Sequence, residues 1–208
     1  MGESMSQGQL WIIAAASGTG KTSLVKALLA ANANLSVSIS HTTRPPRPAE
    51  QNGVDYHFID THAYQAMVKA DAFLEHAQVF DHGYGTAKAS IEALIAQGKD
   101  VLLEIDWQGA QQVRRRWPSV QDIFILPPSR QSLETRLRQR ATDSEAVIQR
   151  RLSDSVTEIR HFSDFRYSVI NDSFDKALLE IQAILNGHGD RYLSSRTEAQ
   201  QLAFELMR

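Results

Sequence analysis

Apolar and polar positions follow two different periods along this chain, and the two periods alternate. A continuous apolar run over 10–15 predicts a buried strand, and the next apolar positions recur at helical spacing over 21–31. Apolar strands are predicted again at 101–105 and 123–126, and helical patterns follow them. Because strands that alternate with helices build a parallel sheet, we expect an α/β fold with helices covering both faces of that sheet.

The pattern between these elements is less regular. Further strands are predicted at 35–39, 56–59, 73–80 and 168–170, and further helices at 87–97, 129–140 and 174–185. Another helix is expected from Thr142, which stands at capping-box spacing from Glu145. Its apolar stripe is Ile148, Leu152, Val156 and Ile159. Three prolines within 44–48 forbid a helix there and hold the chain extended.

Composition narrows the classes of function. The chain has 208 residues, a hydrophobic fraction of 42% and a net charge of −2, which fit one domain with a real core. The near-balanced charge argues against a nucleic-acid partner. There is no cysteine, which excludes a disulfide framework, a thiolate nucleophile and a cysteine-ligated zinc. The apolar run at 10–16 is too short for a membrane helix and follows no basic residue, so we expect a cytoplasmic protein.

The strongest chemical signal is the segment AASGTGKT at 15–22, which follows a predicted strand and opens a predicted helix. Gly18 and Gly20 would let backbone N–H groups curl around an anion at a helix N-terminus. Lys21 would reach the terminal phosphates of a nucleoside triphosphate, and the Thr22 hydroxyl would serve Mg²⁺. The alternative is an ordinary glycine-rich turn. A dinucleotide site is disfavoured because Gly18-Thr-Gly20 is followed by Lys21 and then by Ser23, where that motif needs its third glycine.

The residues that would bind the substrate that accepts the phosphate must lie elsewhere in the chain. Arg44 and Arg47 lie on the proline-locked segment, and a guanidinium fork suits a phosphate dianion. Tyr56 and Tyr84 would add phenolic donors to the same phosphate. A solvated Arg-Pro loop and two partly buried tyrosines are the alternatives.

Three carboxylates stand at unexpected places. Glu75 shares its strand face with apolar residues, and a buried carboxylate needs donors. Guanine offers two adjacent donors, N1–H and N2–H, whereas adenine lacks both; a structural ion pair is the alternative. Glu104 and Asp106 flank the end of the strand at 101–105, where ligands bind in such folds. Asp106 would equally serve as the N-cap of a helix that starts near Trp107.

Five arginines crowd two predicted helices: Arg136, Arg138, Arg140, Arg150 and Arg151. Phosphoryl transfer needs positive charge on the moving phosphate, and a mobile segment can supply it on closure. Most of these arginines fit equally well a solvated helix face with pairs such as Glu134 with Arg138 and Glu145 with Gln149.

Taken together, the phosphate loop, the segment TTRPPR at 42–47 and the segment IDWQGAQ at 105–111 closely resemble the guanylate kinase family of the bacterial type. The resemblance covers roughly 8–188. It implies Mg²⁺-dependent transfer of the ATP γ-phosphate to GMP, giving ADP and GDP, in purine nucleotide metabolism. It implies a P-loop NTPase-like core at 8–40, 93–126 and 163–188, a GMP-binding insert at 41–92 and a helical lid at 127–160, followed by a helical tail at 189–208.

The resemblance also assigns residues. The implied ATP-binding residues are Ala15, Ala16, Ser17, Gly18, Thr19, Gly20, Lys21, Thr22 and, on the adenine side, Asn171. The implied GMP-binding residues are Ser40, Arg44, Arg47, Tyr56, Glu75, Tyr84, Thr86, Glu104 and Asp106. The implied catalytic residues are Lys21, Arg44, Arg140 and Arg151. Mg²⁺ would be served by Thr22 and, through water, by Asp106.

Some positions depart from the family pattern. Ala16 stands where proline is usual, Glu104 where aspartate is common, and Ala141 where glycine follows the lid arginine. None of these changes removes a ligating group, although Glu104 is one methylene longer than aspartate.

Two other functions fit parts of the sequence. A kinase of ribose bisphosphate on the same scaffold would have no use for Glu75 and Ser40 as guanine contacts. A non-catalytic, protein-binding relative would typically lose Lys21 and the lid arginines, which are present here. The tail from Gly189 onward ends in an amphipathic pattern that would cover the core or join a partner, a second copy of the chain included, and both alternatives stay open.

Overall fold

The computed structural model describes residues 8–79, 81–139 and 145–208. These residues fall into two compact units. The first unit contains 34–120 and the described residues up to Trp11, and the second contains 12–33 and 121–208. The predicted starting residue of one helix, Thr142, lies outside the described residues.

The described residues of the first unit contain strands from two sheets and three helices. Its strands are β2 (Leu35–Val37), β3 (His41–Thr42), β4 (His57–Phe58), β5 (Phe73–Val79), β6 (His82–Ala87) and β7 (Asp100–Glu104). Its helices are α2 (Thr61–Lys69), α3 (Lys88–Ala96) and α4 (Trp107–Arg116). Strands β2 and β7 are parallel, with Leu35 opposite Asp100.

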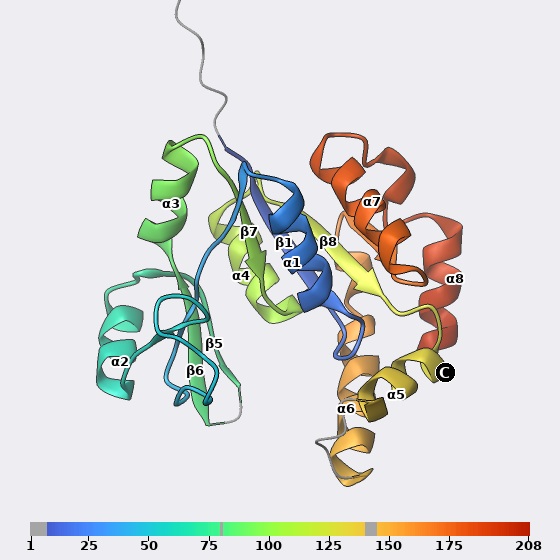
Figure 1. Ribbon diagram of the computed structural model, residues 1–208, viewed down its shortest axis with the longest axis horizontal. Coiled ribbons are helices and arrows are strands. Elements are labelled where there is room, and N and C mark those ends of the chain that lie inside the picture. The colour runs from blue at the N-terminus through green and yellow to red at the C-terminus, as the bar shows by residue number, and fades with distance from the viewer. Residues whose placement is uncertain (1–7, 80, 140–144) are drawn as a thin grey trace, which may run out of the picture. The chain divides into compact units, whose positions relative to one another are not determined.

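A four-stranded sheet in the first unit has the order β4-β3-β6-β5, so that β5 is an edge strand. Figure 1 shows β5 and β6 as a long antiparallel pair beside α2. Helix α4 packs against β5, and the side chains of Phe73 and Leu74 on that strand are buried. Strand β5 therefore lies between β6 and helix α4.

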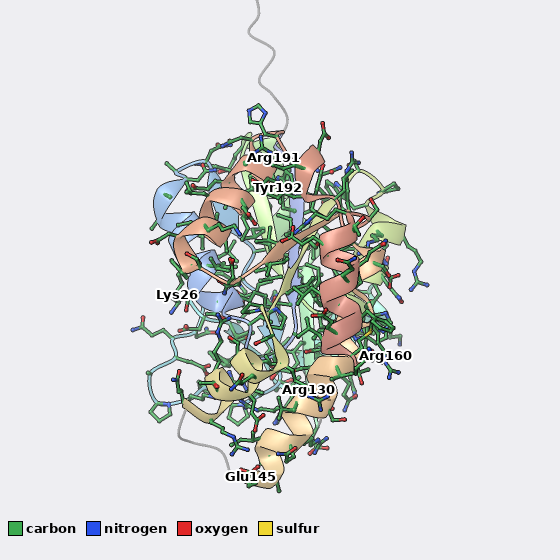
Figure 2. All side chains as sticks on the ribbon, turned by 90° about the vertical axis from the view of Figure 1, so that its right-hand side faces the viewer. Lys26, Arg130, Glu145, Arg160, Arg191 and Tyr192 are labelled. Carbon is green, nitrogen blue, oxygen red and sulfur yellow. The ribbon has the colours of Figure 1, made fainter. Side chains whose placement is uncertain are left out.

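The second unit is built from two parallel strands and a set of helices. Its strands are β8 (Gln121–Leu126) and β9 (Tyr167–Ile170), paired with Ile123 opposite Tyr167. Its helices are α1 (Lys21–Ala31), α5 (Arg130–Gln139), α6 (Glu145–Ile159), α7 (Phe174–Leu185) and α8 (Thr197–Leu206), with short 3-10 turns η1 (Phe162–Asp164) and η2 (Asp190–Tyr192). Figure 2 labels Arg191 and Tyr192 on η2, and Arg130 and Glu145 at the starts of α5 and α6.

Strand β1 (Leu10–Ala15) begins in the first unit and continues into the second. The hydrogen-bonded order of the larger sheet is β2-β7-β1-β8-β9. Side chains along β1 are buried from Leu10 to Ala14, as expected for a strand covered on both faces. The predicted α/β fold with parallel strands and flanking helices is confirmed. No helix among the residues described is long and apolar enough to cross a membrane.

The structure differs from the sequence predictions at two places. No strand was predicted at 82–87, and the segment HGYGTA forms β6 there by pairing with β5 and β3. In α6, the buried stripe includes Ser155, whereas Val156 is only half-buried. Phe80 was expected to end the strand that became β5, and it lies outside the described residues.

The tail covers the core of its own unit. Ala199, Ala203 and Leu206 on α8 are buried, and α8 packs against α6. Arg196, just before α8, donates from Nη1 to the carbonyl of Ser168 on β9 at 2.6 Å. Of the two alternatives for the tail, packing on the core is therefore the one that the structure shows.

Candidate functional site

The loop at 15–22 connects β1 to α1 in a conformation that only glycine adopts readily at two positions. Gly18 has φ 87° and Gly20 has φ 93°, both in the left-handed region. Gly20 is the N-cap of α1 and brings no side chain to accept from the first N–H groups of the helix. The positive end of the α1 dipole therefore lies at this loop, where it favours an anion.

The eight residues from Ala15 to Thr22 line one hollow of about 220 Å³, together with Glu158. The structure thus brings together the predicted phosphate-loop residues. Lys21 is half-buried and Thr22 is exposed at the start of α1, where a lysine ammonium and a hydroxyl would meet a polyphosphate.

The outer side of the loop is braced by residues that are distant in sequence. The carbonyl of Thr19 accepts from Asn171 Nδ2 at 2.6 Å and from Arg136 Nη1 at 3.1 Å. Arg136 Nη2 also donates to the carbonyl of Asn171 at 2.9 Å. The Thr19 hydroxyl donates to the carbonyl of Ala16 at 2.8 Å. These bonds hold the loop in one shape before any ligand arrives.

A second brace comes from α6. The Ser17 N–H donates to Glu158 Oε2 at 2.9 Å, and Ser155 Oγ donates to the Ser17 carbonyl at 3.2 Å. Sequence reasoning missed Ser155 and Glu158 and gave Arg136 no specific role. The one sequence signal for Ser155 and Glu158 was their i, i+3 spacing, which places both residues on the same face of α6. Asn171 was expected on the adenine side, and in this structure its side chain holds Thr19.

The arginines of α5 and α6 differ in their surroundings. Arg138 pairs with Glu134 at 2.8 Å and with Glu145, labelled in Figure 2, at 2.5 Å. The Arg138 hydrogen bond lowers the pKa of Glu145 to about 2. Arg150 lies 4.0 Å from Asp154. The solvated-face alternative therefore holds for Arg138 and Arg150.

The structure describes one of the two arginines predicted for the lid. Arg151 is half-buried on α6, and its carbonyl accepts from Ser155 Oγ at 2.7 Å. Arg140, and Ala141 after it, lie outside the described residues.

In the first unit, Arg44 is held from several sides. Its Nη2 lies 2.7 Å from Glu50 Oε1, and its guanidinium stands 5.5 Å from the ring centre of Tyr56. The Tyr56 and Tyr84 rings are 6.0 Å apart at an edge-to-face angle. The Glu50 hydrogen bond raises the pKa of Arg44, and Tyr84 adds to this shift. Three predicted phosphate contacts are thus brought together.

Glu50 is the residue of this cluster that sequence reasoning missed. Its second oxygen, Oε2, accepts from the Arg47 backbone N–H at 2.8 Å. The Arg47 side chain is exposed. One carboxylate therefore organises both arginines of the proline-locked segment, through the guanidinium of Arg44 and the backbone of Arg47.

The predicted guanine contacts form a hydrogen-bonded chain. Glu75 is only 4% exposed, and Thr86 Oγ1 donates to its Oε1 at 2.5 Å. Ser40 Oγ lies 3.2 Å from Thr86 Oγ1. Burial raises the pKa of Glu75 to about 7; the Thr86 hydrogen bond opposes the shift, and the nearby Asp106 charge adds to it. A buried carboxyl with a raised pKa is typical of a functional site, here one in which a ligand would supply hydrogen-bond donors.

The two carboxylates after β7 have different surroundings. Asp106 Oδ1 accepts from the Gly109 N–H at 2.8 Å, so the predicted alternative of a helix N-cap is correct for α4. Its charge also acts on Glu75. Glu104 is half-buried, and its charge contributes to the raised pKa of Tyr56, for which burial is the main cause. Glu104 therefore faces the phosphate cluster, whereas Asp106 faces the guanine cluster.

No group of three or more His, Asp or Glu side chains that could hold a metal ion occurs in the described part of the chain. Mg²⁺ that accompanies phosphates usually takes only one or two protein ligands and keeps several waters. The exposed Thr22 hydroxyl at the phosphate loop fits such a site.

The chain is similar to known proteins over almost its whole length. The family model described as guanylate kinase matches residues 7–188. The guanylate kinase of Nitrosococcus oceani is 52% identical over 200 residues, which cover 96% of this chain and 98% of that protein. That of Hydrogenovibrio crunogenus is 56% identical over 177 residues, with coverage of 85% and 86%. The crystal structure of guanylate kinase from Anaplasma phagocytophilum matches with a TM-score of 0.72 and 29% identity, over 89% of this chain and 88% of that chain.

Proposed function

The chain belongs to the guanylate kinase family, and on that premise we propose that its two units divide the work of one ATP:GMP phosphotransferase. The reaction transfers the γ-phosphate of ATP to GMP and gives ADP and GDP. The second unit carries the ATP phosphates on the loop at 15–22, and the first unit carries GMP. The observation that carries the GMP assignment is the buried Glu75 carboxylate with its hydroxyl chain.

On the donor side, the loop N–H groups hold the phosphates of ATP. Lys21 follows the γ-phosphate and stabilises the charge that spreads over its oxygens in the transition state. The braces from Arg136, Asn171 and Glu158 support this role, because a preformed loop needs no reorganisation when the reaction occurs.

On the acceptor side, Glu75 accepts from guanine N1–H and N2–H. The Ser40 hydroxyl turns toward O6, while the Thr86 hydroxyl keeps its bond to Glu75 and so orients the carboxylate. Adenine would not supply the two donors that guanine offers to the buried Glu75 carboxylate, and sites built on hydrogen bonds reject such analogues strongly. The low exposure of Glu75 supports this assignment, because water cannot replace the missing partner.

The GMP phosphate meets Arg44, Arg47, Tyr56 and Tyr84. In the structure the Arg44 guanidinium pairs with Glu50. A phosphate dianion replaces that carboxylate on the guanidinium, since the planar guanidinium fork binds either group through two parallel hydrogen bonds. Arg44 thereby stays oriented by Tyr56 whether or not GMP is bound.

The metal and the lid complete the proposal. Mg²⁺ neutralises the charge of the ATP phosphates when bound. Thr22 would hold it, with Asp106 and Glu104 orienting its waters or the acceptor. Arg140 and Arg151 would meet the transferred phosphoryl group. We further predict a cytoplasmic location, where both nucleotide substrates are found, and leave a homo-oligomer as an alternative to a monomer.

The test is ADP formation with GMP, AMP and a ribose bisphosphate as acceptors, in the presence of ATP and Mg²⁺. We expect ADP with GMP and almost none with the other two. Equal turnover of AMP would contradict the guanine site. Turnover of the ribose bisphosphate alone would show that the scaffold serves the rival kinase, and no turnover of any acceptor would favour the non-catalytic module.

A further inference from the structure

The segment at 105–111 identifies the family, yet the proposed function uses only Asp106 from it. The helix that follows, α4, presents a stripe of residues to β5 at Gly109, Gln112 and Arg116. These positions are spaced i, i+3 and i+7, which is the spacing of one helix face. Each of them contacts the strand that carries Glu75.

Gly109 lies beside the Glu75 carboxylate. A Cβ atom at position 109 would lie 2.9 Å from Glu75 Oε2, closer than real Cβ atoms stand to a neighbour. It would also lie 3.3 Å from Cβ and Cδ1 of Ile105. Gly109 is helical rather than left-handed, so its backbone does not require glycine. The space for Oε2 is therefore what the absent side chain provides.

Gln112 holds the backbone next to Glu75. Its Nε2 donates to the carbonyl of His76 at 2.8 Å, and its Oε1 accepts from the His76 N–H at 3.1 Å. Because β5 is an edge strand, this amide takes both backbone groups that a further strand would have taken. Arg116 adds a bond from Nη1 to the carbonyl of Phe73 at 2.5 Å. The helix thus holds β5 on both sides of Glu75.

We propose that Gly109 and Gln112 are positioning residues for guanine selectivity, Gly109 by leaving the place of Glu75 Oε2 open and Gln112 by fixing the strand beneath it. The inference rests on the proposed function, since it concerns the carboxylate that reads guanine. Neither residue touches the base in this account. They act through Glu75, one by shape and the other by hydrogen bonds.

The physical reason is the geometry of the two-point contact. One carboxylate meets N1–H and N2–H together only in one orientation, with Oε1 already held by Thr86. A methyl group at position 109 would push Oε2 away. The atom that must move is the end of a flexible side chain, so the fold tolerates the change, whereas the contact with N2–H does not.

The first experiment compares Gly109→Ala with Gln108→Ala. Gln108 is the exposed neighbour of Gly109 on the same helix, so its substitution is a matched control. The acceptors are GMP and IMP, which lacks the 2-amino group. For Gly109→Ala we expect kcat/KM for GMP to fall about 100-fold, as for a misplaced reacting group, with the GMP-over-IMP ratio narrowed. The KM for ATP should stay within about twofold of wild type.

The melting temperature separates this effect from damage to the fold. Alanine is a better helix former than glycine, so Gly109→Ala should melt no lower than wild type. A lower melting temperature together with a raised KM for ATP would assign Gly109 to the fold and overturn the proposal. An unchanged GMP-over-IMP ratio in a folded variant would overturn it as well.

The second experiment replaces the amide of Gln112. Gln112→Met keeps the length of the side chain and removes both bonds to His76, whereas Gln112→Glu keeps an acceptor for the His76 N–H. We expect Gln112→Met to lose about tenfold in kcat/KM for GMP, with kcat for saturating GMP less affected. Gln112→Glu should fall between Gln112→Met and wild type. Equal GMP kinetics in all three proteins would contradict a positioning role for Gln112.

Failure of this inference can be told from failure of the proposed function. The same plate contains wild type and Glu75→Gln. If wild type does not prefer GMP, the proposed function fails. If wild type prefers GMP but Glu75→Gln leaves the GMP-over-IMP ratio unchanged, Glu75 does not read guanine and its assignment fails. If both behave as expected and Gly109→Ala and Gln112→Met do not, only the positioning by α4 is wrong.

Discussion

Thr86 Oγ1 lies 2.5 Å from Oε1 of the buried Glu75, and the single hydroxyl proton of Thr86 is committed to that carboxylate. Ser40, 3.2 Å from Thr86, is the next member of the chain. A threonine that donates to Glu75 cannot donate to guanine O6 at the same time. The Ser40 hydroxyl is therefore the group that can turn to O6 while Thr86 keeps Glu75 oriented.

The raised pKa of Glu75 predicts that GMP binding is linked to protons. Burial raises this pKa to about 7, and guanine needs the ionised carboxylate. Below pH 7, kcat/KM for GMP should fall about tenfold per pH unit, because it follows the ionised fraction of free enzyme. The measurement is the pH profile from acidic to neutral pH, with the KM for ATP as internal control. If kcat/KM for GMP falls in the same way below pH 7 in Glu75→Gln, a group other than Glu75 titrates.

The raised pKa of Glu75 also makes the stability of the protein depend on pH. The folded state binds the Glu75 proton more tightly than the unfolded state does, so Glu75 makes the free energy of unfolding fall as pH rises from 4.5 to about 7. Glu75→Gln should lack this contribution, which urea unfolding of both proteins over that pH range would measure.

Lys21→Ala should abolish phosphoryl transfer while the protein stays folded. The lysine stabilises charge at the γ-phosphate, and loss of such stabilisation costs orders of magnitude in rate. The check is kcat together with a melting curve. Retention of more than about a tenth of kcat would remove Lys21 from this role, since a tenfold loss is only about 1.4 kcal/mol of barrier.

Substitutions in the proline-locked acceptor loop at 44–48 and in the predicted lid should change different kinetic constants. Arg47→Ala should raise the KM for GMP strongly, because Arg47 is proposed to bind the GMP phosphate. Arg151→Ala should lower kcat with a smaller effect on either KM. Steady-state kinetics with each substrate varied will decide. The division between loop and lid fails if both variants change only the KM for ATP.

Base choice gives the prediction for Glu75→Gln. The amide keeps the size of the side chain and replaces one acceptor oxygen with a donor. GMP should bind about 3 kcal/mol more weakly, as expected for hydrogen bonds to a charged group. The measurement is kcat/KM for GMP and AMP in both proteins, and the ratio should narrow chiefly through loss of GMP. A wild-type ratio in the variant would mean that guanine is read elsewhere.

The brace on the phosphate loop can be tested with two arginines of one helix. Arg136→Ala removes the donor to the carbonyls of Thr19 and Asn171 and should destabilise the protein by about 2 kcal/mol, with a raised KM for ATP. Arg138→Ala breaks exposed pairs with Glu134 and Glu145 and should leave the free energy of unfolding nearly unchanged. Urea unfolding and ATP kinetics compare them, and equal effects would deny Arg136 its bracing role.

The elements that sequence predicts well are those whose signal is local. Strand β1 and helix α1 begin and end where the apolar run and the helical spacing place them. Glu75 stood out because a carboxylate shared a face with apolar residues, and the structure buries it. By contrast, β6 has weak β-propensity and exists through its pairing with two neighbours, which no local pattern records.

The parts of the candidate site that sequence missed depend on contacts between distant segments. Glu158 reaches Ser17, and Arg136 reaches Thr19, across more than a hundred positions in the chain. Glu50 lies close to Arg44 in sequence, yet an acidic residue after a proline-rich stretch predicts no particular partner. The spacing of residues thus reveals groups that would touch ligands, whereas the groups that hold them in place follow only from the fold.

The pairing of Gln112 with the outer edge of β5 also matters before the protein is complete. An edge strand with open N–H and C=O groups is a template for strands of other chains, and natural proteins cover such edges. During synthesis β5 and β6 leave the ribosome before α4, so the hairpin is uncovered until the helix docks. Protein made with Gln112→Met would then be prone to intermolecular association while it folds, with a lower soluble yield at high expression even where the purified enzyme is sound.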